Sequence, residues 1–295
     1  MRHSGALYTL TTPAGTLTFN PDASSGLFLD YDGMQFTADV RTSRVSRPQA
    51  HGSYMDNGFE EGATGVIKGV IGASTLAARK TLEDTFLKCA RSLLGEEGTG
   101  TLTWTEPGGS SPTDDRRITG LRLAAPVQLQ GRGGMLMGFQ LMLAAEKSTA
   151  EESTSSNEDS SALTDGGTGL DFALTFPLVF EASTGGELTL TNSGTATAYP
   201  VLQVYGPIGA PRVTHTTSGS VLPFTSSIGT GDYWEIDLFE RTIKLNGLTS
   251  VLQNLDMDDA TWFGLTVGSN TLRLTGSGFD SNTKLRVVMR DAYAI

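Results

Sequence analysis

The sequence predicts a mainly β protein with two domains and one α-helix. Its 36 glycines are scattered between short apolar runs without any period, which is typical of many turns joining many strands. The 295 residues are enough for two domains of ordinary size. A change in composition divides the chain into a domain at residues 1–145, an acidic Ser/Thr/Gly-rich linker or exposed loop at 146–169, and a second domain at 170–295.

The segment 146–169 holds six acidic residues and one lysine, and Leu163 is its only large apolar residue. Such a composition buries too little surface to offset the entropy lost on ordering. We therefore expect a solvated tether, with a docking segment as the alternative. Both domains should remain folded when residues 148–165 are deleted.

The first domain is expected to consist mainly of strands. Residues 135–143 give the clearest pattern, because every second residue from Met135 to Leu143 is large and apolar. Leu136 and Met142 lie on the opposite face, so this strand is either covered on both sides or meets a neighbouring subunit. Shorter strand patterns occur at residues 15–19, 27–31, 65–71, 100–104 and 118–129.

One α-helix is expected between these strands. Ser74 and Thr75 are residues that cap a helix N-terminus, and Gly95 provides the stop. An apolar stripe with helical spacing lies between them and consists of Leu82, Phe86, Cys89 and Leu93. The helix should pack this stripe on the sheet.

The second domain contains a clear β-hairpin within residues 231–247. Trp234, Ile236 and Leu238 alternate with other residues, and a second alternating run follows at 242–245. Asn246-Gly247 closes the unit, because both residues accept a positive φ cheaply. Trp234 is in phase with the apolar residues and is expected in the core.

The formal net charge of −11 argues against nucleic-acid binding, which needs Lys and Arg gathered on one face. The chain has no apolar run of 18 residues and no apolar N-terminal stretch of signal-peptide length, so we expect no membrane insertion. The single cysteine, Cys89, excludes an intramolecular disulfide and a thiol-based zinc site. These properties fit a cytoplasmic product that leaves the cell only within an assembly.

No residue pattern predicts catalysis, a metal or a cofactor. His3, His51 and His215 stand far apart, and Cys89 lies on the apolar helix stripe, where packing is its expected role. The carboxylates of residues 256–259 lack the glycine and the distal glutamate of a calcium loop. Neither a Gly-x-Ser-x-Gly elbow nor a phosphate-binding Gly-Lys-Ser/Thr sequence occurs.

Trp262 and Phe263 are the candidates for a surface contact in the second domain. They are adjacent in an irregular stretch, whereas Trp234 follows the apolar phase of a strand. Exposed aromatic rings can stack on sugars or contact protein partners. We therefore regard both residues as candidate glycan or partner contacts, by analogy with other β-sandwiches.

An ordered series of motifs resembles the C-terminal domain of siphovirus distal tail proteins, the hub rings that join a phage tail tube to its tip. The series comprises LTLTNSG at 188–194, AYP at 198–200, GPIGAP at 206–211, the hairpin described above, GLTVGSN at 264–270, LRL at 272–274 and LRVVMRDAY at 285–293. In the first half of the chain, residues 42–52 and 65–71 look like the arginine-bearing segment of that family and the strand after it.

The resemblance implies both a fold and a role. The expected fold is an N-terminal tail-tube-like β-sandwich with one flanking α-helix, followed by a C-terminal jelly-roll or galectin-like β-sandwich. The expected role is structural: a homohexameric ring in the virion tail tip, assembled in the host cytoplasm. Its partners would be the tail-tube protein and the tail-tip hub protein, with tape-measure and receptor-binding proteins as further candidates. Leu136 and Met142 are then candidate ring-interface residues, and no cofactor is implied.

Two other functions remain open from the sequence. One is a carbohydrate-binding β-sandwich module that acts directly in adhesion to the host surface, and loss of glycan binding on changing Trp262 to Ala would favour it. The other is an enzyme such as a depolymerase built on a β-scaffold. We see no pair of acids placed on strands that would support an enzyme.

Overall fold

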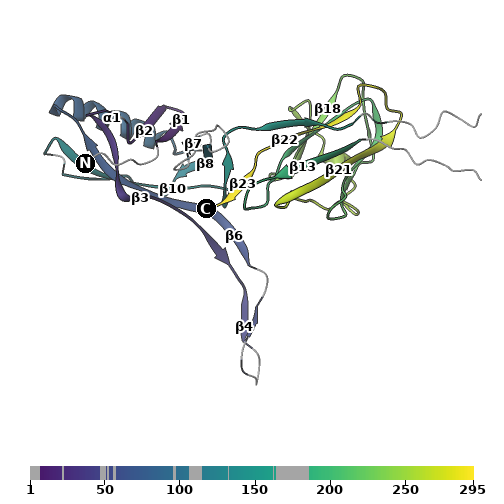
Figure 1. Ribbon diagram of the computed structural model, residues 1–295, viewed down its shortest axis with the longest axis horizontal. Helices are drawn as coiled ribbons and strands as arrows, with labels where there is room; N and C mark the ends of the chain where they lie inside the picture. The colour runs from purple at the N-terminus through teal and green to yellow at the C-terminus, as the bar shows by residue number, and fades with distance from the viewer. Residues whose placement is uncertain are drawn as a thin grey trace, which may run out of the picture. The chain divides into compact units, whose positions relative to one another are not determined.

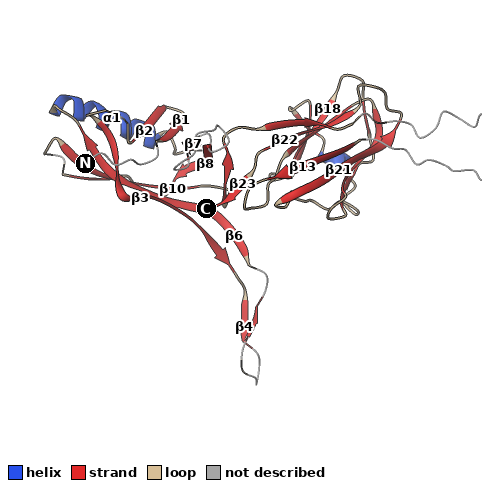
Figure 2. Ribbon diagram, viewed as in Figure 1, coloured by secondary structure: helices blue, strands red, loops and turns tan. Residues whose placement is uncertain are grey.

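The computed structural model describes residues 7–21, 23–46, 51, 53–55, 58–95, 98–105, 115–131, 133–161, 163 and 186–295. The chain divides into two compact units (Figure 1). Unit 1 comprises Met1–Thr154 with Tyr293–Ile295, and unit 2 comprises Ser155–Ala292. Figure 2 shows that strands dominate both units, and the one α-helix of the described residues belongs to unit 1. The mainly β fold class is therefore confirmed.

Ten strands of unit 1 form one sheet. They are β1 (Tyr8–Thr12), β2 (Gly15–Phe19), β3 (Gly26–Arg41), β6 (Phe59–Gly72), β7 (Gly100–Thr105), β8 (Asp115–Leu123), β9 (Gln128–Gln130), β10 (Leu136–Ala144), β11 (Thr149–Glu152) and β23 (Ala292–Ala294). The strand order is β23-β11-β8-β7-β1-β2-β3-β6-β10-β9, and an additional pairing of β8 with β10 closes the sheet on itself. One closed sheet thus takes the place of the two packed sheets of the expected sandwich.

The core of unit 1 contains the residues that the alternation in β10 predicted. Met137, Phe139, Leu141 and Leu143 are each at most 4% exposed. Met135 precedes the strand and is 53% exposed, so the buried face begins two residues later than predicted. The side chains around them include Leu10, Phe19, Ile67, Ile71, Phe86 and Leu121.

The predicted helix is α1 (Leu76–Arg91). Thr75 caps it, because its Oγ1 accepts a hydrogen bond from the Ala78 N–H at 3.1 Å. Phe86 and Cys89 are buried, and the Phe86 ring centroid lies 4.9 Å from that of Phe139 in the sheet. The helix therefore packs its predicted stripe on the sheet, and Cys89 is a core residue.

Strands β3 and β6 continue beyond the rest of the sheet as a two-stranded ribbon, called the arm below (Figure 1). Within the arm, Arg41 pairs with Phe59, and β4 (Arg44–Ser46) and β5 (Ser53–Met55) continue the antiparallel pairing. A two-stranded ribbon has no core of its own. Val40 and Phe59 are accordingly 62% and 58% exposed.

The segment 146–169 is not a tether along its whole length, and this corrects the prediction. Residues 149–152 form β11, which pairs with β8, and β12 (Ser156–Asp159) pairs with β22 (Lys284–Met289). Short strands of this kind need few apolar residues, because backbone hydrogen bonds and cross-strand ion pairs hold them. The units meet in sequence between Thr154 and Ser155 instead of at 145 or 170, and residues 162 and 164–185 lie outside the described residues.

Unit 2 is a sandwich of two antiparallel sheets. One has the order β12-β22, β14 (Val201–Tyr205), β18 (Tyr233–Asp237), β19 (Thr242–Leu245) and β20 (Thr249–Ser250). The other has the order β13 (Glu187–Asn192), β21 (Gly268–Ser277), β15 (Ile208–His215) and β16 (Ser220–Pro223), and β17 (Ser227–Ile228) also pairs with β15. A short 3-10 helix, η2 (Leu252–Asn254), lies outside both sheets. Side chains from both sheets form one core, which includes Leu202, Val204, Trp234, Ile236, Leu272 and Leu274.

The predicted hairpin is formed by β18 and β19. Trp234 pairs with Leu245 and is 2% exposed, as the phase of the apolar residues predicted. Asn246 and Gly247 have φ angles of 51° and 72°, and the Leu248 N–H donates to the Leu245 carbonyl at 3.0 Å. Two central residues with positive φ define a type I′ turn, so Asn-Gly serves the connection from β19 to β20.

Candidate functional site

The outer face of the six-stranded sheet of unit 2 presents a row of polar side chains. Five strands contribute one residue each, in register across the sheet: Asp159 of β12, Arg286 of β22, Gln203 of β14, Glu235 of β18 and Lys244 of β19. The four on β22, β14, β18 and β19 alternate along their strands with core residues, so their side chains face away from the core, and Asp159 of the fully exposed β12 pairs with Arg286 on that same face. We call them the polar row.

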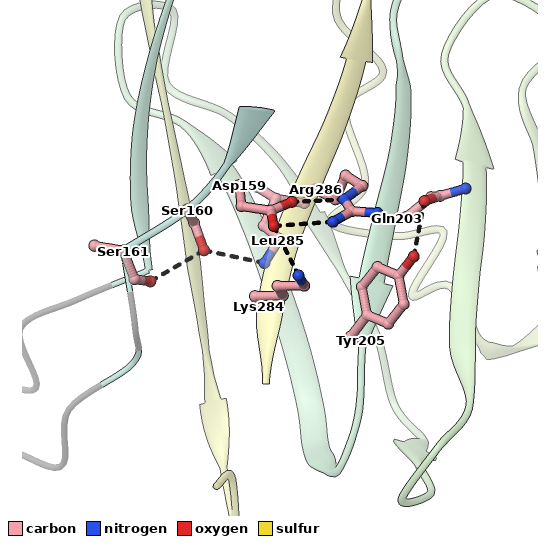
Figure 3. Close-up of polar contacts among 8 residues, drawn as sticks. All are labelled: Asp159, Ser160, Ser161, Gln203, Tyr205, Lys284, Leu285 and Arg286. Carbon is pink, nitrogen blue, oxygen red and sulfur yellow. Dashed lines mark hydrogen bonds and ion pairs between the residues drawn. The ribbon is translucent and has the colours of Figure 1, made fainter. Parts of the chain in front are cut away.

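Asp159 accepts hydrogen bonds from two cationic side chains of β22 (Figure 3). Arg286 donates from Nε at 2.6 Å and from Nη2 at 3.0 Å, and Lys284 donates from Nζ at 2.7 Å. The hydrogen bonds from Arg286 and Lys284 lower the pKa of Asp159 well below its usual range, and Asp159 in turn raises the pKa of Arg286. A bidentate Arg–carboxylate pair of this kind has a defined geometry even where solvent screens its charge.

Ser160 makes a second contact between the end of β12 and β22. Its Oγ accepts a hydrogen bond from the Leu285 N–H at 3.0 Å and donates to the Ser161 carbonyl at 3.1 Å (Figure 3). The Ser160 N–H donates to the Leu285 carbonyl at 2.7 Å. The short edge strand is thus held by backbone and side-chain contacts together.

Tyr205 extends the polar row with an aromatic pair. Its ring centroid lies 5.2 Å from that of Tyr233 in a stacked arrangement. Its hydroxyl donates to Gln203 Oε1 at 3.1 Å, and Gln203 Nε2 donates to Glu235 at 3.2 Å. The Lys284 ammonium lies 5.5 Å from the centroid of the Tyr205 ring, within the range of a cation–π contact.

These contacts give a polar surface whose side chains are already held in place by one another. Such a surface suits contact with a polar partner, because little side-chain entropy remains to be lost on binding. Asp159 is ionised and paired at neutral pH, and within the described ranges no three His, Cys, Asp or Glu side chains gather to hold a metal. The surface is a candidate for recognition.

A second candidate surface lies on the outer side of β3, β6 and β10 in unit 1. Leu136 is 67% exposed, while Met142 is half-buried on the same face of β10. In the strand register, Gly138 of β10 pairs with Val70 of β6, and Val70 pairs with Phe28 of β3. Val70 and Phe28 are both half-buried. Leu136, Met142, Val70 and Phe28 form what we call the apolar face of unit 1.

The two aromatic residues predicted as surface contacts differ in their environment. Phe263 is 7% exposed and its ring stacks on that of His215 at 5.1 Å, so it belongs to the core and its predicted surface role is wrong. Trp262 is half-buried and packs against the same core. Adjacent residues in irregular backbone need not alternate in burial, and the sequence does not reveal which of the two points inward.

The other polar residues weighed in the sequence have structural roles or lie on the surface. His51 is exposed, whereas His215 is buried, and His3 lies outside the described residues. Asp256 accepts a hydrogen bond from the Asp258 N–H at 3.3 Å within its own loop. None of the helices in the described ranges combines the length and apolarity that crossing a bilayer requires.

Sequence reasoning missed the polar row, although part of its signal was present. Lys284 and Arg286 alternate with Leu285 and Val287, which predicts a strand with a cationic outer face. Asp159, however, lies in the segment interpreted as a tether. Its partners Lys284 and Arg286 lie 125 or more positions away in the sequence, and no local pattern predicts such a contact.

Comparisons with known proteins give one family match and several similar solved structures. Residues 193–287 match the family model of the siphovirus-type tail component, C-terminal domain. The crystal structure of Dit from phage SPP1, described as a paradigm of the hub adsorption apparatus in phages infecting Gram-positive bacteria, is similar with a TM-score of 0.62 at 9% identity, covering 97% of this chain and 98% of that chain. Two structures of the phage P2 baseplate in its activated conformation, with Ca and with Sr, have TM-scores of 0.45 at 12% identity, and each covers at least 96% of this chain and 98% of its own.

Among curated protein sequences, none matches the chain. At 9% identity, the likeness to Dit is a likeness of fold, and it extends over both units. The family match, by contrast, rests on sequence and falls within unit 2. Residues 193–287 are therefore similar to the siphovirus-type tail component family, as the motifs predicted, and the whole chain has a fold like that of the SPP1 Dit hub protein.

Proposed function

We propose that the chain is the distal tail hub protein of a siphovirus, a structural subunit that acts by assembly and not by catalysis. Its copies form a closed ring, of six subunits as expected from the family, between the tail tube and the tail tip. The family match of residues 193–287 and the Dit-like fold of the whole chain support this role. Unit 1 makes the ring and unit 2 is peripheral to it.

The observation that carries the ring proposal is the exposure of apolar side chains at two places in unit 1. Leu136 is 67% exposed on the apolar face, and Val40 and Phe59 are 62% and 58% exposed on the arm. Exposed apolar surface of this kind is stabilised when a partner covers it. Contact between two different surfaces of identical copies is head-to-tail, and it closes into a ring when the rotation between copies is suitable.

The ring has two faces, and we assign the tail-tube protein to one and the tail-tip hub protein to the other. Tape-measure and receptor-binding proteins are further partners, the latter through unit 2. In this proposal unit 1 is tail-tube-like, unit 2 is a sandwich of the jelly-roll or galectin-like type, and the ring assembles in the host cytoplasm before it becomes part of the virion tail tip. The two antiparallel sheets of unit 2 are consistent with that type.

Mass photometry of the purified full chain tests the ring directly. We expect particles of six copies, and we expect Leu136→Asp to weaken assembly at least about thirtyfold, because a buried interface residue of this size contributes about 2 kcal/mol or more. Met142→Gln should have a smaller effect in the same direction, since Met142 is already half-buried in the single chain.

The matched control is Leu248→Asp. Leu248 is 84% exposed in unit 2, so the same charge is introduced at a more exposed position outside the proposed interface. Wild-type rings and Leu248→Asp rings should be equally stable. A wild-type chain that stays monomeric at micromolar concentration, or a Leu136→Asp variant that assembles as well as the wild type, would overturn the ring proposal.

Direct glycan binding by unit 2 remains the alternative function, but its support is weaker. Phe263 is buried, and Trp262 is partly covered by the core, so the aromatic surface proposed for sugar stacking is reduced to one half-buried ring. Titration of the full chain with host-surface glycans, compared with Trp262→Ala, distinguishes the two functions. Binding that is lost in Trp262→Ala, by a chain that forms no ring, favours the module.

A further inference from the structure

His215 lies at the end of β15 and is 1% exposed, which is unusual for a side chain that can carry a positive charge. Its Nε2 lies 3.2 Å from Asn270 Oδ1, its Nδ1 lies 2.8 Å from Ser218 Oγ, and its ring stacks on Phe263. We call these four residues the His215 cluster. They come from the end of β15, the turn that follows it, β21, and the segment 261–268 that precedes β21.

The hydrogen bonds of Asn270 determine which nitrogen of His215 carries the proton. Asn270 Nδ2 donates to the carbonyls of Thr266 at 2.7 Å and Gly268 at 2.9 Å, so its Oδ1 must be the acceptor. The Thr266 N–H donates to that oxygen at 3.0 Å. His215 Nε2 therefore carries a hydrogen and donates to Asn270, and the bare Nδ1 accepts from the Ser218 hydroxyl.

Neutral His215 thus satisfies both nitrogens of its ring, whereas protonated His215 would carry a positive charge in a buried site. A proton on Nδ1 would require the Ser218 hydroxyl to turn from His215 toward Ser220 Oγ, 3.0 Å away. The positive charge would face the Ser218 hydroxyl, the Asn270 amide and the Phe263 ring, none of which is anionic. A buried charge without a partner is costly.

The charged residues on the elements packed against His215 do not compensate the positive charge of its protonated ring. Arg212 on β15 and Arg273 on β21 alternate with the inward-facing residues of their strands, and Arg273 faces Glu187 of β13 at 3.9 Å. Asp256, Asp258 and Asp259 precede the segment 261–268, and they are half-buried or exposed in their own loop. Burial accordingly lowers the pKa of His215, and the hydrogen bond that its Nε2–H donates to Asn270 opposes this change.

We infer that unit 2 contains an acid-sensitive contact. Protonation of His215 releases the turn at residues 216–219 and the segment 261–268 from the N-terminal end of β21. This segment carries Trp262 and the 56% exposed Val267, so its release changes the surface that unit 2 offers to a partner. The inference does not depend on ring formation. It predicts a conformational response between neutral and mildly acidic pH.

The sign of the response follows from the direction of the pKa change. Because the pKa of His215 is lowered in the folded state, the open state binds the proton more tightly. The closed cluster is fully stable above the ordinary value of 6.5 and loses stability as the pH falls below it. At about pH 5.5, roughly one unit below the ordinary value of 6.5, protonation can change the opening equilibrium by at most about tenfold.

Hydrogen exchange of the full chain at about pH 7.5 and about pH 5.5, corrected for intrinsic rates, tests the inference. The amides of Thr216, Gly219 and Thr266 should exchange faster at the lower pH, by up to about tenfold, and amides of β14 and β18 in the opposite sheet should change less than about twofold. Equal protection of all these amides at the two pH values would overturn the inference.

His215→Gln is the matched variant, because Gln keeps an N–H donor for Asn270 and cannot be charged. It should abolish the difference between the two pH values. The same acid response in His215→Gln would assign the response to another group and overturn the inference. If this variant does not fold, NMR of wild-type protein labelled with ¹⁵N-histidine still tests the contact. An Nδ1–H tautomer of His215 at neutral pH, or a pKa of His215 above 6.5, contradicts the proposed contact.

Discussion

Glu151 and Asp159 each pair with two cationic side chains and help to hold a short strand to its neighbour. Glu151 of β11 accepts from Arg117 of β8 at 2.9 Å and also contacts Lys147. Burial raises the pKa of Glu151, but the charges and hydrogen bonds of Lys147 and Arg117 lower it by more. At neutral pH both carboxylates are therefore ionised and paired, and each offsets the lack of apolar residues in its strand.

Asp159→Asn should remove a small, pH-dependent contribution to stability. The pKa of Asp159 is lowered in the folded state, so its contribution is present above the ordinary value of 3.8 and is lost as the pH falls below that value. We expect a destabilisation of no more than about 1 kcal/mol at neutral pH, because the pair is solvent-exposed. Urea unfolding of wild type and variant at about pH 7 and about pH 3 measures it.

Glu158→Gln is the control for this substitution, since Glu158 is an exposed carboxylate on the same strand. Its effect should be smaller than that of Asp159→Asn at neutral pH. If the difference in unfolding free energy between wild type and Asp159→Asn grows on acidification instead of shrinking, the stabilising role of the Asp159 ion pair is contradicted.

At the scale of elements, β23 shows how a three-residue strand can matter. It pairs with β11 at the edge of the closed sheet, and the Arg116 guanidinium lies 3.6 Å from the centroid of the Tyr293 ring. Tyr293 is also packed against the core of unit 1. The last residues of the chain therefore belong to the unit that the first 154 residues build.

Tyr293→Ala should destabilise unit 1 by about 1–3 kcal/mol, through loss of the cation–π contact and of packing. Hydrogen exchange of amides in β8 and β11 measures the effect within that unit. Ile295→Ala, at an exposed position two residues later, should change stability by no more than about 0.5 kcal/mol. An equal effect of the two substitutions would argue against a specific role for Tyr293.

On the scale of the whole molecule, the chain passes between the two units twice, after Thr154 and after Ala292. β11 and β12 lie on either side of the first crossing, and β22 and β23 lie on either side of the second. Each unit consequently needs residues from the segment that composition assigned to a tether. The expectation that residues 148–165 are dispensable conflicts with this arrangement.

Replacing residues 149–152 by Gly-Ser repeats should reduce hydrogen-exchange protection in unit 1, and the same replacement at 156–159 should reduce it in unit 2. The physical reason is that each replacement removes an ion pair and the side chains of one paired strand. We expect each to cost about 1–3 kcal/mol in the affected unit. Unchanged protection in both units would restore the tether interpretation.

Local patterns in the sequence were enough for the elements whose signal is contained within a few residues. The helix from Leu76 to Arg91, the strand from Leu136 to Ala144 and the hairpin around Trp234 were all predicted, because helical and strand periods and turn residues act over short distances. The family motifs likewise lie in short runs, and the family match of residues 193–287 confirms them.

The candidate surfaces were predicted only in part. Leu136 was identified from the second apolar face of its strand and is exposed, although its role in a ring stays a prediction. The polar row was not found, because it is made of residues from five strands that share a face only in the folded sheet. Phe263 was misassigned, because an irregular segment has no period that tells inward from outward.

By itself, the sequence determined the fold class, the positions of the strongest elements and the family resemblance of the second half, since these depend on residue type and spacing along the chain. Only the tertiary structure decided that β11 and β12 are strands, that the first sheet closes on itself, and that His215 is buried among uncharged neighbours. The reason is that strand pairing and burial depend on partners far away in the sequence, and their stabilising contacts exist only once those partners meet.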